Sequence, residues 1–116
     1  MRHHRKGRAF ARKDNQRKAL LRSLARGLIL NDKMETSIAK AKEIRPIIEK
    51  LITKAKINNL TTRRLLQSRL GNNDSSIDKL FETAKRFEKR NGGYTRIIKL
   101  PIRKSDSSER AIIEFV

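Results

Sequence analysis

Apolar residues recur three and four positions apart over residues 14–29, which is the spacing of one face of an α-helix. Asp14 or Asn15 is predicted to cap this helix, because a short polar side chain can accept a backbone N–H at that position. The predicted buried face consists of Leu20, Leu21, Leu24 and Leu28, with Ala25 on its shoulder. An apolar face this broad is expected to pack against a core.

The same spacing returns after a short polar link and predicts a second, longer helix that ends near Lys56. Thr36 or Ser37 is predicted to cap it, and the brief segment 34–36 before it is predicted as a strand. Pro46 lies inside the helix, where it removes a backbone donor and clashes with the preceding turn. Because the apolar phase is kept on both sides of this proline, the sequence predicts one kinked helix.

Two shorter helices are predicted after residue 60. Thr61 or Thr62 is expected to cap the first of them, which runs over residues 63–70. Ser75, three residues before Asp78, resembles a capping box and is expected to open the second. The predicted core face of this fourth helix consists of Ile77, Leu80, Phe81, Ala84 and Phe87, and it is expected to stop at Asn91, Gly92 and Gly93.

β-Branched and aromatic residues dominate the end of the chain, from Tyr94 to Ile102 and again from Ala111 to Val116. A polar turn separates the two runs, so they predict a C-terminal β-hairpin. The sequence therefore predicts an α+β fold of about four helices and a small sheet, in a single globular domain over residues 14–116. Residues 1–13 show no sustained apolar period and are predicted to form an extended basic arm that is disordered alone in water.

Charge adds a functional prediction to this fold. The chain of 116 residues contains 30 Lys and Arg and 12 Asp and Glu, which gives a formal net charge of +18. Residues 1–30 contain ten of these cations and a single acid, so this quarter of the chain carries a net +9. Gathering so many cations is costly unless a polyanion neutralises them and releases its own counterions. The charge distribution therefore predicts a nucleic-acid partner.

The pattern offers no catalytic, cofactor or metal site. The carboxylates are scattered among an excess of cations, and the five glycines form no nucleotide-binding loop. The chain has no cysteine and no apolar run near about 18 residues, and its basic start lacks the apolar stretch of a secretory signal. We expect no enzyme, no small-molecule substrate, no cofactor and no membrane span. An organellar transit peptide is disfavoured, because such peptides are usually rich in Ser and residues 1–13 contain none.

Candidate RNA-binding residues begin in the predicted arm. They are Arg2, His3, His4, Arg5, Lys6, Arg8, Arg12 and Lys13. A free amino terminus followed by His3 could instead wrap Cu(II) or Ni(II), but nothing else in the chain would complete a specific metal site. Hydrogen bonds to RNA are the simpler role for histidines in an Arg-rich segment.

Further candidates lie in the first predicted helix and beyond it. Lys18, Arg22 and Arg26 recur every four residues, roughly opposite the apolar face, and form a cationic stripe that follows Arg17. Asp14 is the one acid within helical reach, so Arg22 and Arg26 have no intrahelical ion-pair partner. The remaining candidates are Arg63 and Arg64, which like Arg69 lack acids nearby in the sequence, Tyr94, where a base could stack, and Arg96.

Three stretches of sequence carry a family resemblance over nearly the whole chain. They are MRHHRKGRAFARKDNQRKALLRSLARGLI at the start, KAKEIRPIIEKLITKAK over residues 40–56, and GGYTRIIK over 92–99 followed by AIIEFV over 111–116. In this order and at this spacing they resemble the bacterial large-subunit ribosomal protein seventeen family.

The resemblance implies an α+β protein bound to large-subunit rRNA and to neighbouring ribosomal proteins near the outlet of the peptide tunnel. Its role there would be structural and assembly-related, in the cytoplasm on the ribosome, with an organellar ribosome left open. From the residues alone, a nucleoid-type DNA-binding protein is the main alternative, and a cationic membrane-surface protein is a weaker one. The sequence shows no obvious dimer interface and contains no Trp, which membrane binding favours.

Overall fold

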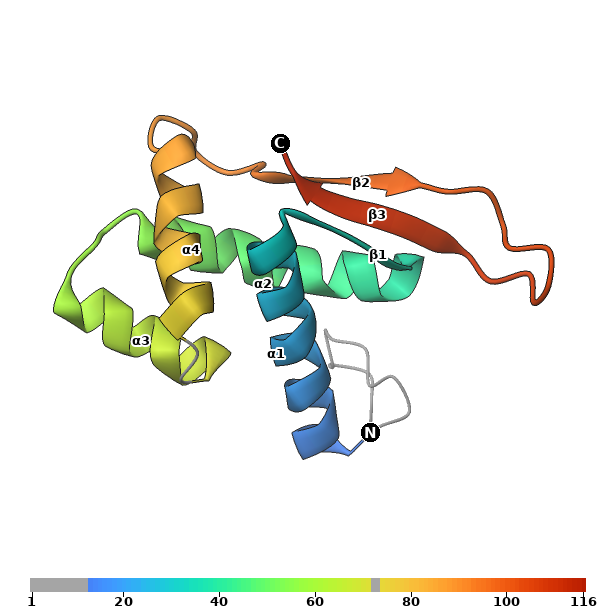
Figure 1. Cartoon of the computed structure of the whole chain (residues 1–116), viewed down its shortest axis with the longest axis horizontal. Helices are drawn as coiled ribbons and strands as arrows, with labels where there is room; N and C mark the ends of the chain where they lie inside the picture. The colour runs from blue at the N-terminus through green and yellow to red at the C-terminus, as the bar shows by residue number, and fades with distance from the viewer. Residues whose placement is uncertain (1–12, 72–73) are drawn as a thin grey trace, which may run out of the picture.

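A computed structural model describes residues 13–71 and 74–116, which form four helices and a three-stranded sheet (Figure 1). The elements are α1 (Asp14–Asn31), β1 (Lys33–Ser37), α2 (Ile38–Ala55), α3 (Leu60–Leu70), α4 (Asp74–Arg86), β2 (Thr95–Lys99) and β3 (Arg110–Phe115). The predicted α+β class, the helix count and the C-terminal hairpin are confirmed. The predicted basic arm, apart from Lys13, lies outside the described residues.

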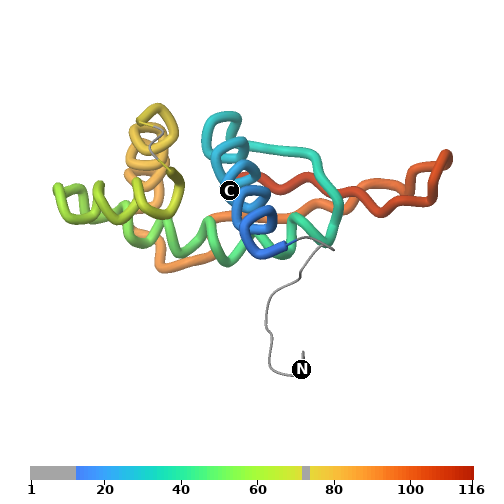
Figure 2. Tube along the Cα trace, turned by 90° about the horizontal axis from the view of Figure 1, so that it is seen from below, coloured from blue at the N-terminus to red at the C-terminus, as the bar shows by residue number. Residues whose placement is uncertain are grey.

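The sheet has the strand order β1-β3-β2, so the last strand of the chain is central and pairs antiparallel with both neighbours. The strand predicted at 34–36 is confirmed as β1, in which Thr36 pairs with Ala111. Side chains alternate between the faces of a strand, and Ala111, Ile113 and Phe115 of β3 are buried on the face that joins the core. The β2-β3 hairpin extends to one side beyond the helices (Figures 1 and 2).

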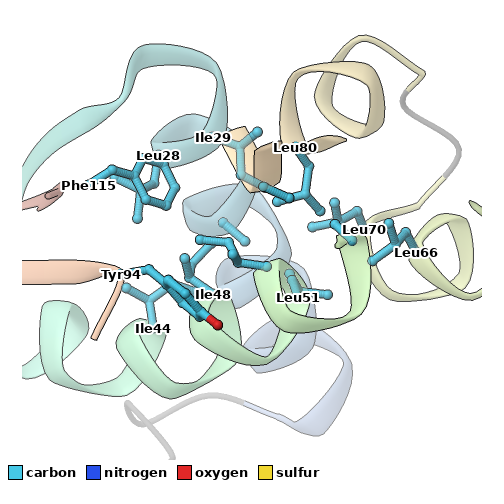
Figure 3. Packing of buried hydrophobic residues seen from close by; sticks show 14 of the residues in the cluster. Leu28, Ile29, Ile44, Ile48, Leu51, Leu66, Leu70, Leu80, Tyr94 and Phe115 are labelled. Carbon is cyan, nitrogen blue, oxygen red and sulfur yellow. The ribbon is translucent and has the colours of Figure 1, made fainter. Parts of the chain in front are cut away.

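Helix α2 is the central element of the core. It runs through Pro46 as one helix, which confirms that the proline does not divide it, whereas the predicted kink stays a prediction. Six of its residues are buried: Ala41, Ile44, Ile48, Leu51, Ile52 and Ala55. The other helices and the sheet supply the remaining core residues, among them Leu28, Ile29, Leu66, Leu70, Leu80, Tyr94 and Phe115 (Figure 3). Because α2 contacts every other helix and all three strands, it fixes how α1 and α3 lie beside each other.

The buried face of α1 is rotated relative to the predicted one. Ala25, Leu28 and Ile29 are buried, whereas Leu21 and Leu24 are only half-buried. At 100° per residue, this moves the centre of the buried face away from Leu24 and toward Ala25. Lys18 and Arg22, predicted to lie opposite the core, are therefore only about 20° and about 60° from Ala25 around the helix axis, and they lie on the core side of α1 toward its amino-terminal end.

Two of the predicted helix caps can be compared directly with side-chain hydrogen bonds. Ser37 caps α2 as predicted, because its hydroxyl accepts the Lys40 backbone N–H at 3.3 Å. The predicted Thr61 or Thr62 cap of α3 is wrong. Asn59 is the cap, and its Oδ1 accepts the Thr62 backbone N–H at 2.8 Å, so the helix begins at Leu60.

The starts of α1 and α4 also differ from the prediction. Lys13 occupies the cap position of α1 without a side-chain cap, and Asp14 is already helical, with its carboxylate 3.1 Å from the Arg17 guanidinium. Ser75 lies inside α4, which begins at Asp74, so it is not the residue that opens that helix. Helix α4 also ends earlier than predicted, at Arg86, although Phe87 in the following turn remains buried.

The Asn59 cap leads to a first prediction. Asn59→Ala is expected to destabilise the protein by about 0.5–2 kcal/mol, because the substitution leaves the Thr62 N–H without its side-chain acceptor. Urea unfolding followed by circular dichroism measures the change. Thr61→Ala is the matched control and should change stability by less, since Thr61 is exposed and does not cap the helix. Equal losses in the two variants would contradict the assignment.

Candidate nucleic-acid interface

A groove of about 580 Å³ lies among helices α1, α2 and α3, which contact one another pairwise. Five of its lining residues are cations, contributed by all three helices: Lys18 and Arg22 from α1, Lys50 and Lys54 from α2, and Arg69 from α3. No carboxylate lines the groove among the described residues. The helix packing therefore concentrates positive charge that the sequence distributes over fifty positions.

The groove cations are exposed and arranged in pairs. Lys18 and Arg22 lie one helical turn apart, and so do Lys50 and Lys54, which corresponds to a rise of about 6 Å along each helix. Within residues 13–71 and 74–116, none of the five groove cations forms a salt bridge. Their charge is therefore available to a polyanion.

The floor of the groove is apolar. It consists of Leu21, Ala25, Ile47, Leu51 and Leu70. Ala25, Leu51 and Leu70 belong to the buried core, and Leu21 and Ile47 are half-buried against it. The groove is thus lined both by exposed cations and by residues at the edge of the hydrophobic core.

The sequence predicts part of this cation set. Lys18 and Arg22 are candidates that lie in the groove, and among the described residues no acid forms a salt bridge with Arg69, as its sequence neighbourhood indicates. Lys50 and Lys54 were missed. Their four-residue spacing repeats that of Lys18 and Arg22, which was an available signal, but only the packing of α2 against α1 brings the two pairs together.

Arg26, the third member of the predicted stripe, has a structural contact instead. Its Nη1 donates to the Leu70 carbonyl oxygen at 2.9 Å, and the residue is half-buried. This bond ties α1 to the carboxyl end of α3, where the last carbonyls of a helix lack helical donors. Gly71 follows with a φ of +79°, and a Cβ added there would lie 3.2 Å from the same Nη1. Of the three stripe residues, Lys18 and Arg22 therefore line the groove, whereas Arg26 joins α1 to α3.

This division predicts opposite effects for two neighbouring substitutions. Arg26→Gln is expected to destabilise the protein by about 1–3 kcal/mol, because the Leu70 carbonyl loses a charged donor. Arg22→Gln should leave stability nearly unchanged and lower the salt dependence of RNA binding by about 0.7–0.9 in the slope of log affinity against log salt. Urea unfolding and binding titrations at several salt concentrations separate the two effects. The same profile in both variants would contradict the division.

Two further candidate arginines are ion-paired. The Arg63 guanidinium lies 2.9 Å from Asp78 and 3.9 Å from Asp74, both on α4, so the prediction that Arg63 lacks acidic neighbours is wrong. The acids are distant in sequence and become neighbours only when α3 packs on α4. Arg96 lies 2.6 Å from the Glu114 carboxylate across the β2-β3 pair. Arg64 is exposed on α3, outside the set of residues that line the groove.

Tyr94 was predicted at a position where a base could stack, and this placement is wrong. The residue is 1% exposed, its ring packs on Phe87 with centroids 5.2 Å apart, and its hydroxyl lies 3.3 Å from the Thr53 hydroxyl. The Lys56 ammonium and the Thr53 hydroxyl lower the pKa of Tyr94, because both stabilise the phenolate form. Tyr94 is therefore a core residue that joins the sheet to α2.

The remaining candidates lie at or before the start of α1. Lys13 is exposed, and Arg17 is half-buried against Asp14. The other arm residues lie outside the described part of the chain: Arg2, His3, His4, Arg5, Lys6, Arg8 and Arg12. No helix within 13–71 and 74–116 is both long and apolar enough to cross a membrane.

The fold and the groove together define a small, strongly basic α+β protein with a surface suited to nucleic acid. The chain belongs to the family described as Ribosomal protein L17, whose sequence profile matches residues 20–116. The resemblance found in the three sequence stretches is thereby confirmed. The family is a structural, non-enzymatic one, which confirms the prediction that the chain is not an enzyme.

Several curated relatives carry the name Large ribosomal subunit protein bL17. The relative from Hydrogenobaculum sp. (strain Y04AAS1) is 58% identical over 118 residues, covering 100% of this chain and 99% of that protein. The relative from Persephonella marina is 50% identical over 118 residues, covering 100% of this chain and 95% of that protein. The relative from Nautilia profundicola is 48% identical over 120 residues, with 100% and 98% covered.

Proposed function

We propose that this chain is a structural constituent of the large ribosomal subunit and binds large-subunit rRNA through the groove among α1, α2 and α3. The observation that carries the proposal is the convergence of five cations on a chain of net charge +18, with no carboxylate among the lining residues that the structure describes. Two walls of the groove are formed by α1, with Lys18 and Arg22, and by α2, with Lys50 and Lys54. Phosphates placed along these walls would meet a cation at each turn and release their counterions. The names of the relatives favour rRNA over DNA as the polyanion.

The basic arm is proposed to extend the same interface. Lys13 and Arg17 lie at the amino-terminal end of α1, directly after the arm in the sequence. Lys18, which lines the groove, is the next residue after Arg17. The arm, the first turn of α1 and the groove would thus contact one continuous stretch of rRNA. Neighbouring large-subunit proteins are proposed as further partners, and the cytoplasmic ribosome as the location.

Sedimentation tests this proposal in its simplest form. A tagged full-length chain, expressed in a bacterial host, is expected to travel with the large subunit and with the assembled ribosome when a lysate is separated on a sucrose gradient. A variant with glutamine at Lys18, Arg22, Lys50 and Lys54 should shift toward the top of the gradient. Full-length protein that stays at the top, or that follows chromosomal DNA in a nuclease-sensitive manner, would contradict the proposal.

A further inference from the structure

We infer that the groove among α1, α2 and α3 holds an unstacked nucleotide of an RNA strand, with the flanking phosphates on the cations of its two walls. The inference rests on the proposed function, because it names the form of RNA that the same groove selects. It predicts that the protein prefers a bulged or single-stranded nucleotide to an uninterrupted duplex.

The walls of the groove are cationic and its floor is apolar, so one ligand that fills it must carry both negative charge and an apolar surface. Phosphates satisfy the cations of the two walls, Lys18 and Arg22 on one and Lys50 and Lys54 on the other. The floor between them exposes part of Leu21 and Ile47, which are half-buried, and gains nothing from a phosphate. A base that has left its stack has two apolar faces, and contact with this floor removes apolar surface of both partners from water.

An uninterrupted RNA duplex would contact the cations of the groove and would leave its apolar floor uncovered. Its phosphates would contact the wall cations, but its bases stay stacked and paired, and its deep major groove keeps their edges from side chains. The floor would then remain uncovered. A strand with one extruded nucleotide covers both the cations and the floor, and the guanidinium planes of Arg22 and Arg69 provide surfaces on which a base can stack.

The size of the groove agrees with such a ligand. Its volume of about 580 Å³ lies in the range of about 300–1,000 Å³ that is typical of small-ligand pockets. An acidic amphipathic peptide is the other ligand that could combine negative charge with an apolar face. RNA is favoured because the proposed function of this ribosomal protein family member already names rRNA as the partner, and because the cations recur along α1 and α2 at the regular spacing that a polyanion can follow.

The test compares two RNA hairpins of equal length and equal phosphate number that are closed by the same compact loop of stacked bases, of which only one carries a single-nucleotide bulge. The bulged nucleotide is 2-aminopurine, whose fluorescence reports its stacking. The full-length protein is expected to bind the bulged hairpin about tenfold more tightly, a factor that corresponds to about 1.4 kcal/mol, and to change the 2-aminopurine emission.

The floor is tested by the double variant Leu21→Gln and Ile47→Gln. It should lose most of the preference for the bulge and retain the salt dependence, because the wall cations remain. The control variant carries Ile57→Gln and Leu60→Gln, two apolar residues that are each 62% exposed and do not line the groove, and it should keep the preference. Should the floor variant fail to fold, the single variant Leu21→Gln keeps the test, because Leu21 is half-buried, and it is expected to lower the preference by less than the double variant.

The possible results separate the inference from the proposed function. Equal affinity for the two hairpins with a steep salt dependence would overturn the inference and leave rRNA binding intact. Weak, salt-independent binding of both hairpins would overturn both. An acidic amphipathic peptide that binds the groove and loses affinity in the floor variant, while the two hairpins bind equally, would replace the nucleotide with a protein ligand.

Discussion

The affinity of the full-length chain for large-subunit rRNA is expected to fall by roughly 10³–10⁵ between about 50 and 200 mM salt, as for a protein that contacts about 6–10 phosphates. The five groove cations could supply up to five of these contacts, and the arm would supply the rest. Because counterion release sets the slope, each contact that is removed should lower it by about 0.7–0.9. Affinity measured by filter binding at several salt concentrations gives this slope.

The decisive variant replaces Lys18, Arg22, Lys50 and Lys54 with glutamine, and its slope is expected to be lower by about 3. The matched control removes the same number of charges from exposed lysines that do not line the groove: Lys33, Lys42, Lys85 and Lys89. This control has the same net charge, so any long-range effect of charge on RNA binding is equal in the two variants. If both lower the slope equally, rRNA responds to the overall charge and the groove has no special role.

The sequence predicted the elements of the fold well because each helix carries its own apolar period. The weak strand at 34–36 was also predicted, and it became β1 because β3 offers it an antiparallel partner, as between Thr36 and Ala111. The phase of α1 was harder to predict. A leucine-rich face favours Leu20 and Leu24, but the contacts of α1 with α2 and α4 decide which side is buried, and there Ala25 is 1% exposed while both leucines are half-buried.

The candidate site was predicted only in part, because charge pairing depends on tertiary contacts. Arg63 appeared free in the sequence, but its partner Asp78 lies fifteen residues away on α4. Lys50 was not among the candidates, because only the packing of α2 on α1 places it in the same groove as Lys18. Sequence spacing identifies cations that lack local partners, and the packing of the helices then decides which of them remain available to RNA.

The largest effect on stability is expected from Leu28→Ala, at about 2–5 kcal/mol. Leu28 is fully buried and packs in the core together with Ile29 of the same helix and Phe115 of β3 (Figure 3). The substitution removes apolar surface from the core and leaves a cavity where α1 meets the sheet. Urea unfolding of the free protein, followed by circular dichroism, measures the loss.

Leu30→Ala in the same helix is the matched control, since Leu30 is 46% exposed and leaves no cavity when truncated. Leu24→Ala should fall between the two, because Leu24 is half-buried against the core. None of these leucines lines the groove, so each variant should keep the salt slope of the unsubstituted chain under conditions where it is folded. A loss for Leu28→Ala no greater than that for Leu30→Ala would contradict the packing of α1 on the core, and with it the position of Lys18 and Arg22 beside Lys50 and Lys54.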